Sequence, residues 1–242
     1  MRLQWLVLVV VLAAMAADHF VVWRSFLKQV RVDAAKARRT LWWRFAMLMW
    51  GSSALVLWLW IASGVSMSSV GFALPDGWRL WGPLALGGAF VLLQANGAIR
   101  IARLPAAGEK LRGQLGGAEP MMPRTAAELP AFFGVSLTAG FCEELLFRGF
   151  LIWMLQPWLG LWIAAALALA LFALGHAYQG LEGVIRTGAV GLVFTAIVLV
   201  THSLWPAIVL HAAVDAMGGV IAWLILRNPV PSSPAVDALT QR

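Results

Sequence analysis

The sequence has 242 residues, of which 61% are hydrophobic and 12% are charged. With a mean hydropathy of +0.81, this composition lies outside the range of soluble globular domains and predicts an integral membrane protein. A formal net charge of +7 could also indicate a nucleic-acid partner. Because the basic residues lie between apolar runs and have no fold of their own to present them, we predict that the protein binds no nucleic acid.

Apolar runs of about 20 residues, the length that crosses a bilayer, follow one another along the chain. The runs are continuous and do not alternate with a period of two, so helices are favoured over a β-barrel. We predict an all-α membrane protein, a bundle of about seven transmembrane helices whose functional core is formed by the C-terminal four. The predicted spans are about 3–23, 41–62, 80–99, 129–155, 158–177, 183–201 and 203–226.

The first apolar run, residues 1–17, has two interpretations. Its basic Arg2, apolar stretch and small residues are also features of a cleavable signal peptide. Cleavage would force the strongly basic segment 24–44 across the membrane, which the positive-inside rule opposes. We therefore predict a first transmembrane helix that ends near Asp18.

Basic residues are concentrated in alternate connections between the spans. Segments 24–44 and 100–124 carry most of the lysines and arginines, so the positive-inside rule places both in the cytoplasm. The other connections contain Arg79 as their one basic residue; they are about 63–79, 156–160 and 202–206. The charge distribution and the helix count agree on an N-out, C-in arrangement, which we predict for a bacterial cytoplasmic (inner) membrane.

Segment 104–130 is the clearest break in hydrophobicity, and it is rich in glycine, proline and charge. It separates the three N-terminal helices from the four C-terminal ones. We predict transmembrane helices with cytoplasmic loops in residues 1–128, a helix bundle that holds the functional site in 129–227, and a disordered tail in 228–242.

The stretch GFCEELLFRGF, residues 140–150, places Glu143, Glu144 and Arg148 inside a predicted span. A charge near the middle of a transmembrane helix costs roughly 2.5–3.5 kcal/mol, so each of these groups requires compensation. Glu144 and Arg148 are four residues apart in the order that favours a helical ion pair. Glu143 is rotated about 100° from Glu144, so its partner must come from another helix.

Few other polar side chains lie deep in the predicted spans. His176 follows Phe172 by one turn near the end of the fifth span, and His211 and Asp215 share one face of the last span. We expect Glu143, His176, His211 and Asp215 to converge and to perturb one another's protonation, as the groups of reactive sites do. Each histidine alone could instead bond to a backbone carbonyl, an alternative that explains the whole set less well.

Two further reactive side chains are interpreted as structural. His202 lies near the outer end of its span beside a short turn. Cys142 is the single cysteine, which excludes an intramolecular disulfide and a paired-cysteine metal motif. Its side chain is offset in angle from that of the adjacent Glu143 on the helix, so we interpret it as a packing residue rather than a thiol nucleophile.

Three ordered motifs resemble those of the CAAX prenyl protease and bacteriocin-processing (CPBP) intramembrane endopeptidases. The resemblance covers about residues 130–220. The family patterns E-E-x-x-x-R, F-x-x-x-H and H-x-x-x-N/D read here as Glu143-Glu144 with Arg148, Phe172 with His176, and His211 with Asp215. The departure is at 215, where the family more often has asparagine.

The resemblance implies that a glutamate-activated water hydrolyses a peptide bond without a cofactor. In this interpretation Glu143 is the general base and His176 orients the same water. His211, assisted by Asp215, would donate to the oxyanion. An ionised Asp215 could only orient His211, and it could donate only if burial kept it protonated.

Glu144, Arg148 and Phe172 would support this set by holding the helix that carries Glu143. The expected partners are the lipid bilayer and a peptide or protein substrate, either a lipidated protein or the precursor of a secreted peptide. We expect the cavity to open to the cytoplasm or sideways into lipid. The sequence does not specify the substrate or the oligomeric state.

Three alternatives stay open. The same glutamate, histidines and aspartate are acceptable zinc ligands, although the sequence lacks an H-E-x-x-H motif. Ionisable residues at mid-membrane also build proton relays in transporters, although no inverted repeat is present here. The chain could also be a non-catalytic immunity or scaffolding protein.

Overall fold

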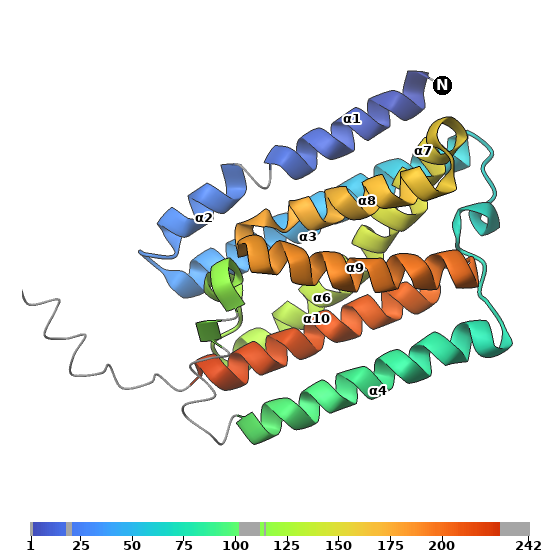
Figure 1. Ribbon diagram of the computed structural model, residues 1–242. Helices are drawn as coiled ribbons and strands as arrows, with labels where there is room; N and C mark the ends of the chain where they lie inside the picture. Colours follow the sequence, from blue (N-terminus) through green and yellow to red (C-terminus); the bar gives the residue numbers. More distant parts are fainter. Residues whose placement is uncertain (1, 18–20, 102–111, 114, 228–242) are drawn as a thin grey trace, which may run out of the picture.

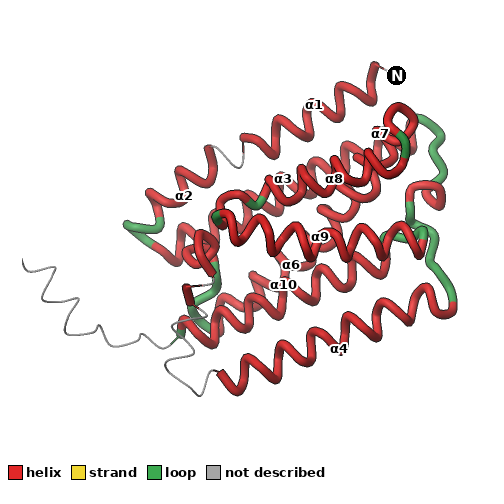
Figure 2. The backbone as a smooth tube through the Cα atoms, in the orientation of Figure 1, coloured by secondary structure: helices red, strands yellow, loops and turns green. Residues whose placement is uncertain are grey.

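The computed structural model describes residues 2–17, 21–101, 112–113 and 115–227, whose regular structure is helical and contains no strand (Figure 1). The predicted all-α fold is therefore confirmed. The predicted disordered tail, the predicted helix end near Asp18 and much of the connection 104–130 lie outside the described residues. Figure 2 shows helices along the length of the bundle and loops gathered at its two ends.

The N-terminal helices are α1 (Arg2–Ala17), α2 (Trp23–Gln29), α3 (Ala34–Ala62) and α4 (Gly77–Ile101). The C-terminal helices are α6 (Leu129–Glu143), α7 (Ile152–Leu159), α8 (Leu161–Gly175), α9 (Leu181–Thr201) and α10 (Trp205–Leu226). A π-helical segment, Glu144–Leu151, joins α6 to α7 without a break. Short 3₁₀ turns occupy Met67–Val70, Gly116–Met121, Ala126–Glu128 and Ala177–Gln179.

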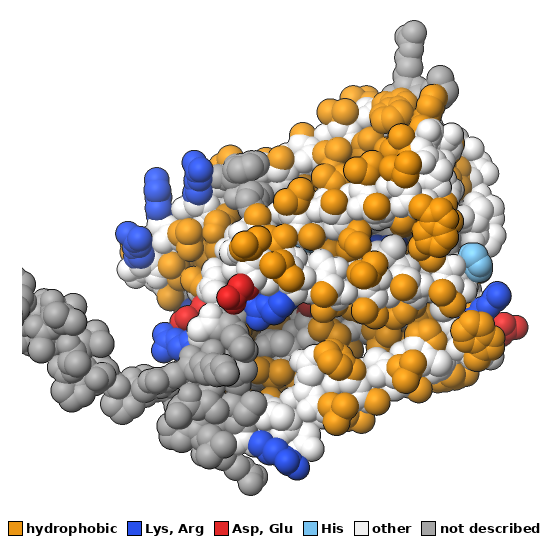
Figure 3. Space-filling model, in the orientation of Figure 1, with side chains coloured by type: hydrophobic (Ala, Val, Ile, Leu, Met, Phe, Trp, Pro, Cys, Tyr) orange, Lys and Arg blue, Asp and Glu red, His pale blue; other side chains and the backbone are white. Residues whose placement is uncertain are grey.

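Five helices are long and apolar enough to cross a membrane: 34–62, 77–100, 126–159, 181–201 and 205–226. The other two predicted spans correspond to α1 and α8, which are apolar but shorter. Leu86, Trp162 and Leu181 are at least 75% exposed on the outside of the bundle, where lipid would cover them. Figure 3 shows such hydrophobic side chains along the flanks of the molecule.

Successive long helices run in alternate directions through the bundle (Figure 1). One end holds α2, the start of α3 and the turns 116–121 and 177–179, and the other end holds the loop 63–76 and the turn at His202. The strongly basic N-terminal connection and the described part of the basic segment 100–124 therefore share one end, as predicted. Which end faces the cytoplasm stays a prediction.

α6 packs so closely against α10 that two glycines at the crossing have no room for a side chain. A Cβ on Gly140 would lie 2.8 Å from the Cβ and backbone nitrogen of Ala212 and 2.8 Å from the Ile208 carbonyl. A Cβ on Gly219 would overlap the ring of Phe132. Small residues let transmembrane helices approach one another in this way, and this crossing brings Glu143 of α6 beside His211 of α10.

The N-terminal helices pack against the same core. Val7 of α1 and Trp60 of α3 belong to one buried cluster with Phe147 and Phe172. At the end of the bundle that holds α2, the Arg38 side chain of α3 donates to Glu128 Oε1 at 2.7 and 3.0 Å. The helices α1 and α3 thus share a core with the C-terminal helices. The domain boundary predicted at 128 stays a prediction.

Candidate active site

A cavity of about 490 Å³ lies inside the bundle. Its walls come from α1, α2, α3, α4 and the C-terminal helices, and Glu143, Phe172, His176, His211 and Asp215 all line it. The four side chains expected to converge therefore meet in one hollow. Glu144 and Arg148 lie behind the wall, with 0% and 4% of their surface exposed.

The junction between α6 and the π-helical segment separates the two adjacent glutamates. Glu143 is the last residue of α6, and its carboxylate lines the cavity. Glu144 is the first residue of the π-helical segment and is fully buried. Short π-helical insertions are frequent at functional sites, but this one has no distinctive sequence pattern, and the sequence predicted an ordinary helix here.

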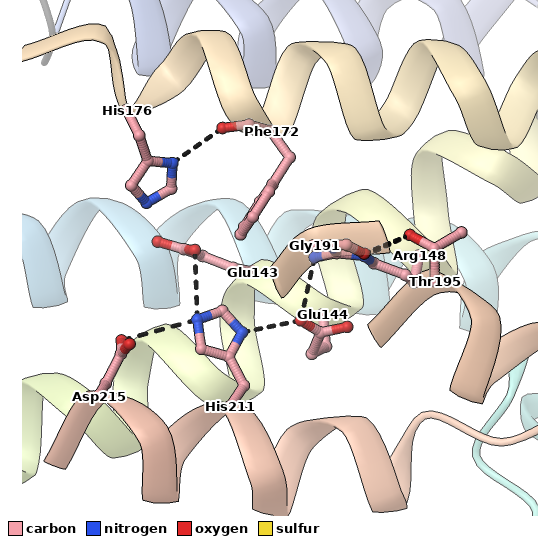
Figure 4. Close-up of polar contacts among 9 residues, drawn as sticks. All are labelled: Glu143, Glu144, Arg148, Phe172, His176, Gly191, Thr195, His211 and Asp215. Carbon is pink, nitrogen blue, oxygen red and sulfur yellow. Dashed lines mark hydrogen bonds and ion pairs between the residues drawn. The ribbon is translucent and has the colours of Figure 1, made fainter. Parts of the chain in front are cut away.

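His211 lies between three carboxylates (Figure 4). Its Nδ1 is 2.8 Å from Glu144 Oε1, and because a carboxylate only accepts, Nδ1 carries a proton. Its Nε2 is 3.7 Å from Glu143 Oε2 and 3.6 Å from Asp215 Oδ2. Glu144 thus fixes the ring so that Nε2 faces the cavity between the other two acids.

Glu143 Oε2 is buried and has no hydrogen-bond partner within the described part of the chain. Its 3.7 Å separation from His211 Nε2 is an ionic contact but too long for a hydrogen bond. The partner that the sequence required from another helix is therefore His211. The lone pairs of this oxygen stay available to a group inside the cavity.

His176 follows the last residue of α8. Its Nδ1 donates to the Phe172 carbonyl at 2.8 Å, so in the neutral ring Nε2 carries a lone pair. Figure 4 shows the His176 ring directed toward the Glu143 carboxylate, and both residues line the cavity. The sequence left open that a bond to a backbone carbonyl was the only role of each histidine. In His176 this bond also fixes the orientation of Nε2.

Arg148 compensates the buried charge of Glu144 and ties the π-helical segment to α9. It donates to Glu144 Oε1 at 3.0 Å, to the Gly191 carbonyl at 2.9 Å and to Thr195 Oγ1 at 3.3 Å. Its guanidinium also lies 4.2 Å from the centre of the Phe172 ring. The predicted Glu144–Arg148 pair is present, and all three nitrogens of the guanidinium are hydrogen-bonded.

Sequence reasoning missed the contribution of α9. The ring of Phe194 stacks on His211 with centroids 5.0 Å apart, and Gly191 and Thr195 accept from Arg148. A Cβ on Gly191 would lie 2.8 Å from the Phe172 ring. A glycine, a threonine and a phenylalanine in an apolar helix give no sequence signal, so only the packing assigns them to the site.

The side chains interpreted as structural lie away from the cavity wall. Cys142 is fully buried, and His202 is exposed at the end of α9 with a φ of 56°. Arg38 belongs to segment 24–44, which was predicted to connect the first two spans, but it lies in α3 and is 5% exposed. Its ion pair with Glu128 explains the burial, because the two charges neutralise one another.

The cavity reaches the end of the bundle that carries the basic connections. Trp23, Met121 and Tyr178 line it there. Beside them, Glu119 accepts from Arg112 and Arg124 at 2.9 to 3.1 Å. Burial raises the pKa of Glu119, but these two guanidinium groups outweigh it and hold the pKa below its usual value.

The described residues include no group of three or more His, Cys, Asp or Glu side chains arranged to hold a metal ion. His211 Nδ1 and His176 Nδ1 are already engaged by Glu144 and the Phe172 carbonyl. Any ligand set would therefore need the two Nε2 atoms together with Glu143 or Asp215.

Residues 125–217 match the protein-family model described as Type II CAAX prenyl endopeptidase Rce1-like. The predicted family resemblance is confirmed over this segment. The segment runs from the turn before α6 into α10 and contains all the residues of the three motifs. Together with the five apolar helices, the match to a membrane protease family indicates an integral membrane protein. No curated protein and no solved structure gives a significant match.

Proposed function

We propose that the protein is a glutamic-type intramembrane endopeptidase that cleaves a membrane-associated peptide or lipidated protein precursor. One observation carries the proposal: a carboxylate and two imidazoles from three different helices line one cavity inside the bundle. The match to a protease family supports the same reaction class. A substrate bond that enters this cavity would meet a base and a donor already fixed in place.

In the proposed reaction Glu143 takes a proton from a substrate water, whose oxygen attacks the scissile carbonyl carbon. His176 accepts a hydrogen bond from the same water through Nε2, the nitrogen that its bond to Phe172 leaves unprotonated. The carbonyl oxygen becomes an oxyanion. When the carbon–nitrogen bond breaks, Glu143 passes its proton to the leaving amine.

His211 is the proposed donor to the oxyanion. Because Nδ1 already donates to Glu144, Nε2 can donate only when the ring carries both protons. The carboxylates of Glu143 and Asp215, within 3.7 Å of Nε2, attract the positive charge of that form. Glu144 and Arg148 act as positioning residues that fix the ring before substrate binds.

Substrate trapping tests the proposal. Loss of a general base lowers rates by ~10²–10⁴-fold, so Glu143→Gln should accumulate an uncleaved precursor that mass spectrometry of membrane and secreted peptides detects. His176→Ala should give the same precursor. Glu182→Gln, at an exposed position of α9, and His202→Ala are matched controls that should process normally. The absence of any accumulating precursor in Glu143→Gln cells would contradict the proposal.

Chelation distinguishes the glutamic mechanism from a zinc mechanism using the same side chains. We expect activity of the purified protein to survive exhaustive chelation, with no stoichiometric metal in elemental analysis. Loss of activity that added zinc restores would overturn the glutamic assignment and leave the protease assignment intact.

A further inference from the structure

A basic surface lies beside the mouth of the cavity, on α2 and the start of α3. Arg24, Lys28 and Arg31 follow one another at helical spacing, and Lys36 and Arg39 continue the surface. All five side chains are exposed, and within the described part of the chain none has an ion-pair partner. The nearby acid, Asp33, is used as the N-cap of α3, where it accepts from Lys36 N at 2.9 Å.

The position of this surface matches the edge of a bilayer. Figure 3 shows basic side chains beyond the hydrophobic flanks, at the end of the bundle that holds α2. Leu27 and Val32 are exposed among the basic residues, at 38% and 90%. Basic side chains with interspersed apolar ones are typical of segments that lie on an anionic membrane surface.

The opposite face of α2 covers part of the active-site cavity. Phe26 is 3% exposed and packs with Ala37 and Leu41 of α3. The Trp23 ring lies 4.6 Å from the ring of Tyr178, which lies 6.1 Å from the ring of His176. A short helix thus connects the basic surface to the residue that we propose orients the water.

We propose that the basic surface formed by Arg24, Lys28, Arg31, Lys36 and Arg39 docks on anionic phospholipid headgroups and thereby holds Trp23 against Tyr178 at the mouth of the cavity. Charge complementarity identifies the partner, since five uncompensated cations face the level of the headgroups. The binding does not depend on the catalytic activity. Only the consequence for catalysis, through the contact of Trp23 with Tyr178 near His176, rests on the proposed function.

Native mass spectrometry of the intact protein tests the binding. With phosphatidylglycerol and phosphatidylcholine in competition, the wild-type protein should retain phosphatidylglycerol preferentially. The variant Arg24→Gln/Lys28→Gln/Arg31→Gln should lose affinity on the order of 100-fold, from about one factor of five per basic residue. The control Arg79→Gln, which removes a basic residue near the start of α4 at the opposite end of the bundle, should bind as wild type. Equal binding of both lipids by the wild type, or an unchanged triple variant, would overturn the proposal.

Competition with soluble glycerol phosphate distinguishes binding to a lipid surface from binding of a free phosphate. We expect it not to displace phosphatidylglycerol, because a single headgroup engages few of the five cations. Displacement at matched concentration would show a phosphate site instead of a membrane surface.

A thiol reporter tests the coupling to the cavity without requiring turnover. The native Cys142 is fully buried, so Gln179→Cys would place the one accessible thiol on the cavity wall near its mouth. In bilayers that contain phosphatidylglycerol, a water-soluble maleimide should label this thiol more slowly than in phosphatidylcholine alone, and the triple variant should abolish the difference. Equal rates in the two lipids would overturn the coupling. If the lipid changes labelling but no peptide is ever cleaved, the proposed function fails and this inference stands.

Discussion

The carboxylate of Glu144 accepts from Arg148 and from His211, so one fully buried side chain joins the π-helical segment to α10. Both hydrogen bonds go to Oε1, whereas Oε2 is buried without a hydrogen-bond partner in the described part of the chain. Removing Arg148 or His211 would therefore leave the buried carboxylate with less compensation for its charge. The buried charges of Glu144 and Arg148, although costly in a membrane, therefore fix the direction in which His211 Nε2 points.

Asp215 provides the prediction at the residue scale. Its side chain is 41% exposed toward the cavity and lies 3.6 Å from His211 Nε2. Asparagine keeps the shape of this side chain and supplies an N–H donor, so Asp215→Asn should retain substantial activity. Its loss should be smaller than the ~10²–10³-fold cost of removing an oxyanion donor. Steady-state kinetics beside Glu143→Gln measures this, and equal losses in the two variants would refute a merely orienting role for Asp215.

The close crossing of α6 and α10 decides the site at the scale of elements. Glu143 is three residues after Gly140, and His211 precedes Ala212, the residue that a Cβ on Gly140 would contact. Any increase in the distance between these helices would move the base away from the proposed oxyanion donor. The precision of the site therefore depends on a glycine that carries no functional group.

Gly140→Ala should lower both stability and activity. The new Cβ meets backbone atoms of α10 at 2.8 Å, and overpacking of this kind costs about 1–3 kcal/mol. Gly134→Ala on the same helix is a matched control, because its Cβ would meet nothing within 4 Å. Thermal unfolding in detergent and turnover of the same samples provide the measurements. Wild-type stability and activity in Gly140→Ala would show that the crossing tolerates separation.

At the scale of the whole molecule, alternating helix directions gather both basic connections at the end where the cavity opens. If the predicted N-out, C-in orientation holds, the mouth faces the cytoplasm and its anionic leaflet. Substrate access, lipid contact and membrane topology are then consequences of one distribution of charge.

Cysteine labelling in intact cells tests that orientation. Ser68 and Lys36 are exposed at opposite ends of the bundle, and the native Cys142 is buried. A membrane-impermeant maleimide should label Ser68→Cys from outside and should label Lys36→Cys only after the membrane is opened. The reverse pattern would place the cavity mouth on the outer side and contradict the predicted topology.

Hydrophobicity alone was enough to predict an all-helical membrane protein, because a bilayer permits few other spanning structures. Spacing alone predicted the Glu144–Arg148 pair, since side chains four residues apart share one face of a helix. The ionisable side chains Glu143, His176, His211 and Asp215 indicated a site from sequence alone, because isolated polar groups are costly in lipid.

The tertiary structure alone decided how these groups meet. Which nitrogen of His211 faces Glu143 follows from its bond to Glu144, and the separation of the two glutamates follows from a π-helical segment. The contributions of Gly191 and Thr195 depend on how α9 packs against Arg148. The local sequence determines the periodicity of each helix and the free-energy cost of its polar residues in the membrane. Contacts between helices depend instead on shape complementarity among residues far apart in the chain.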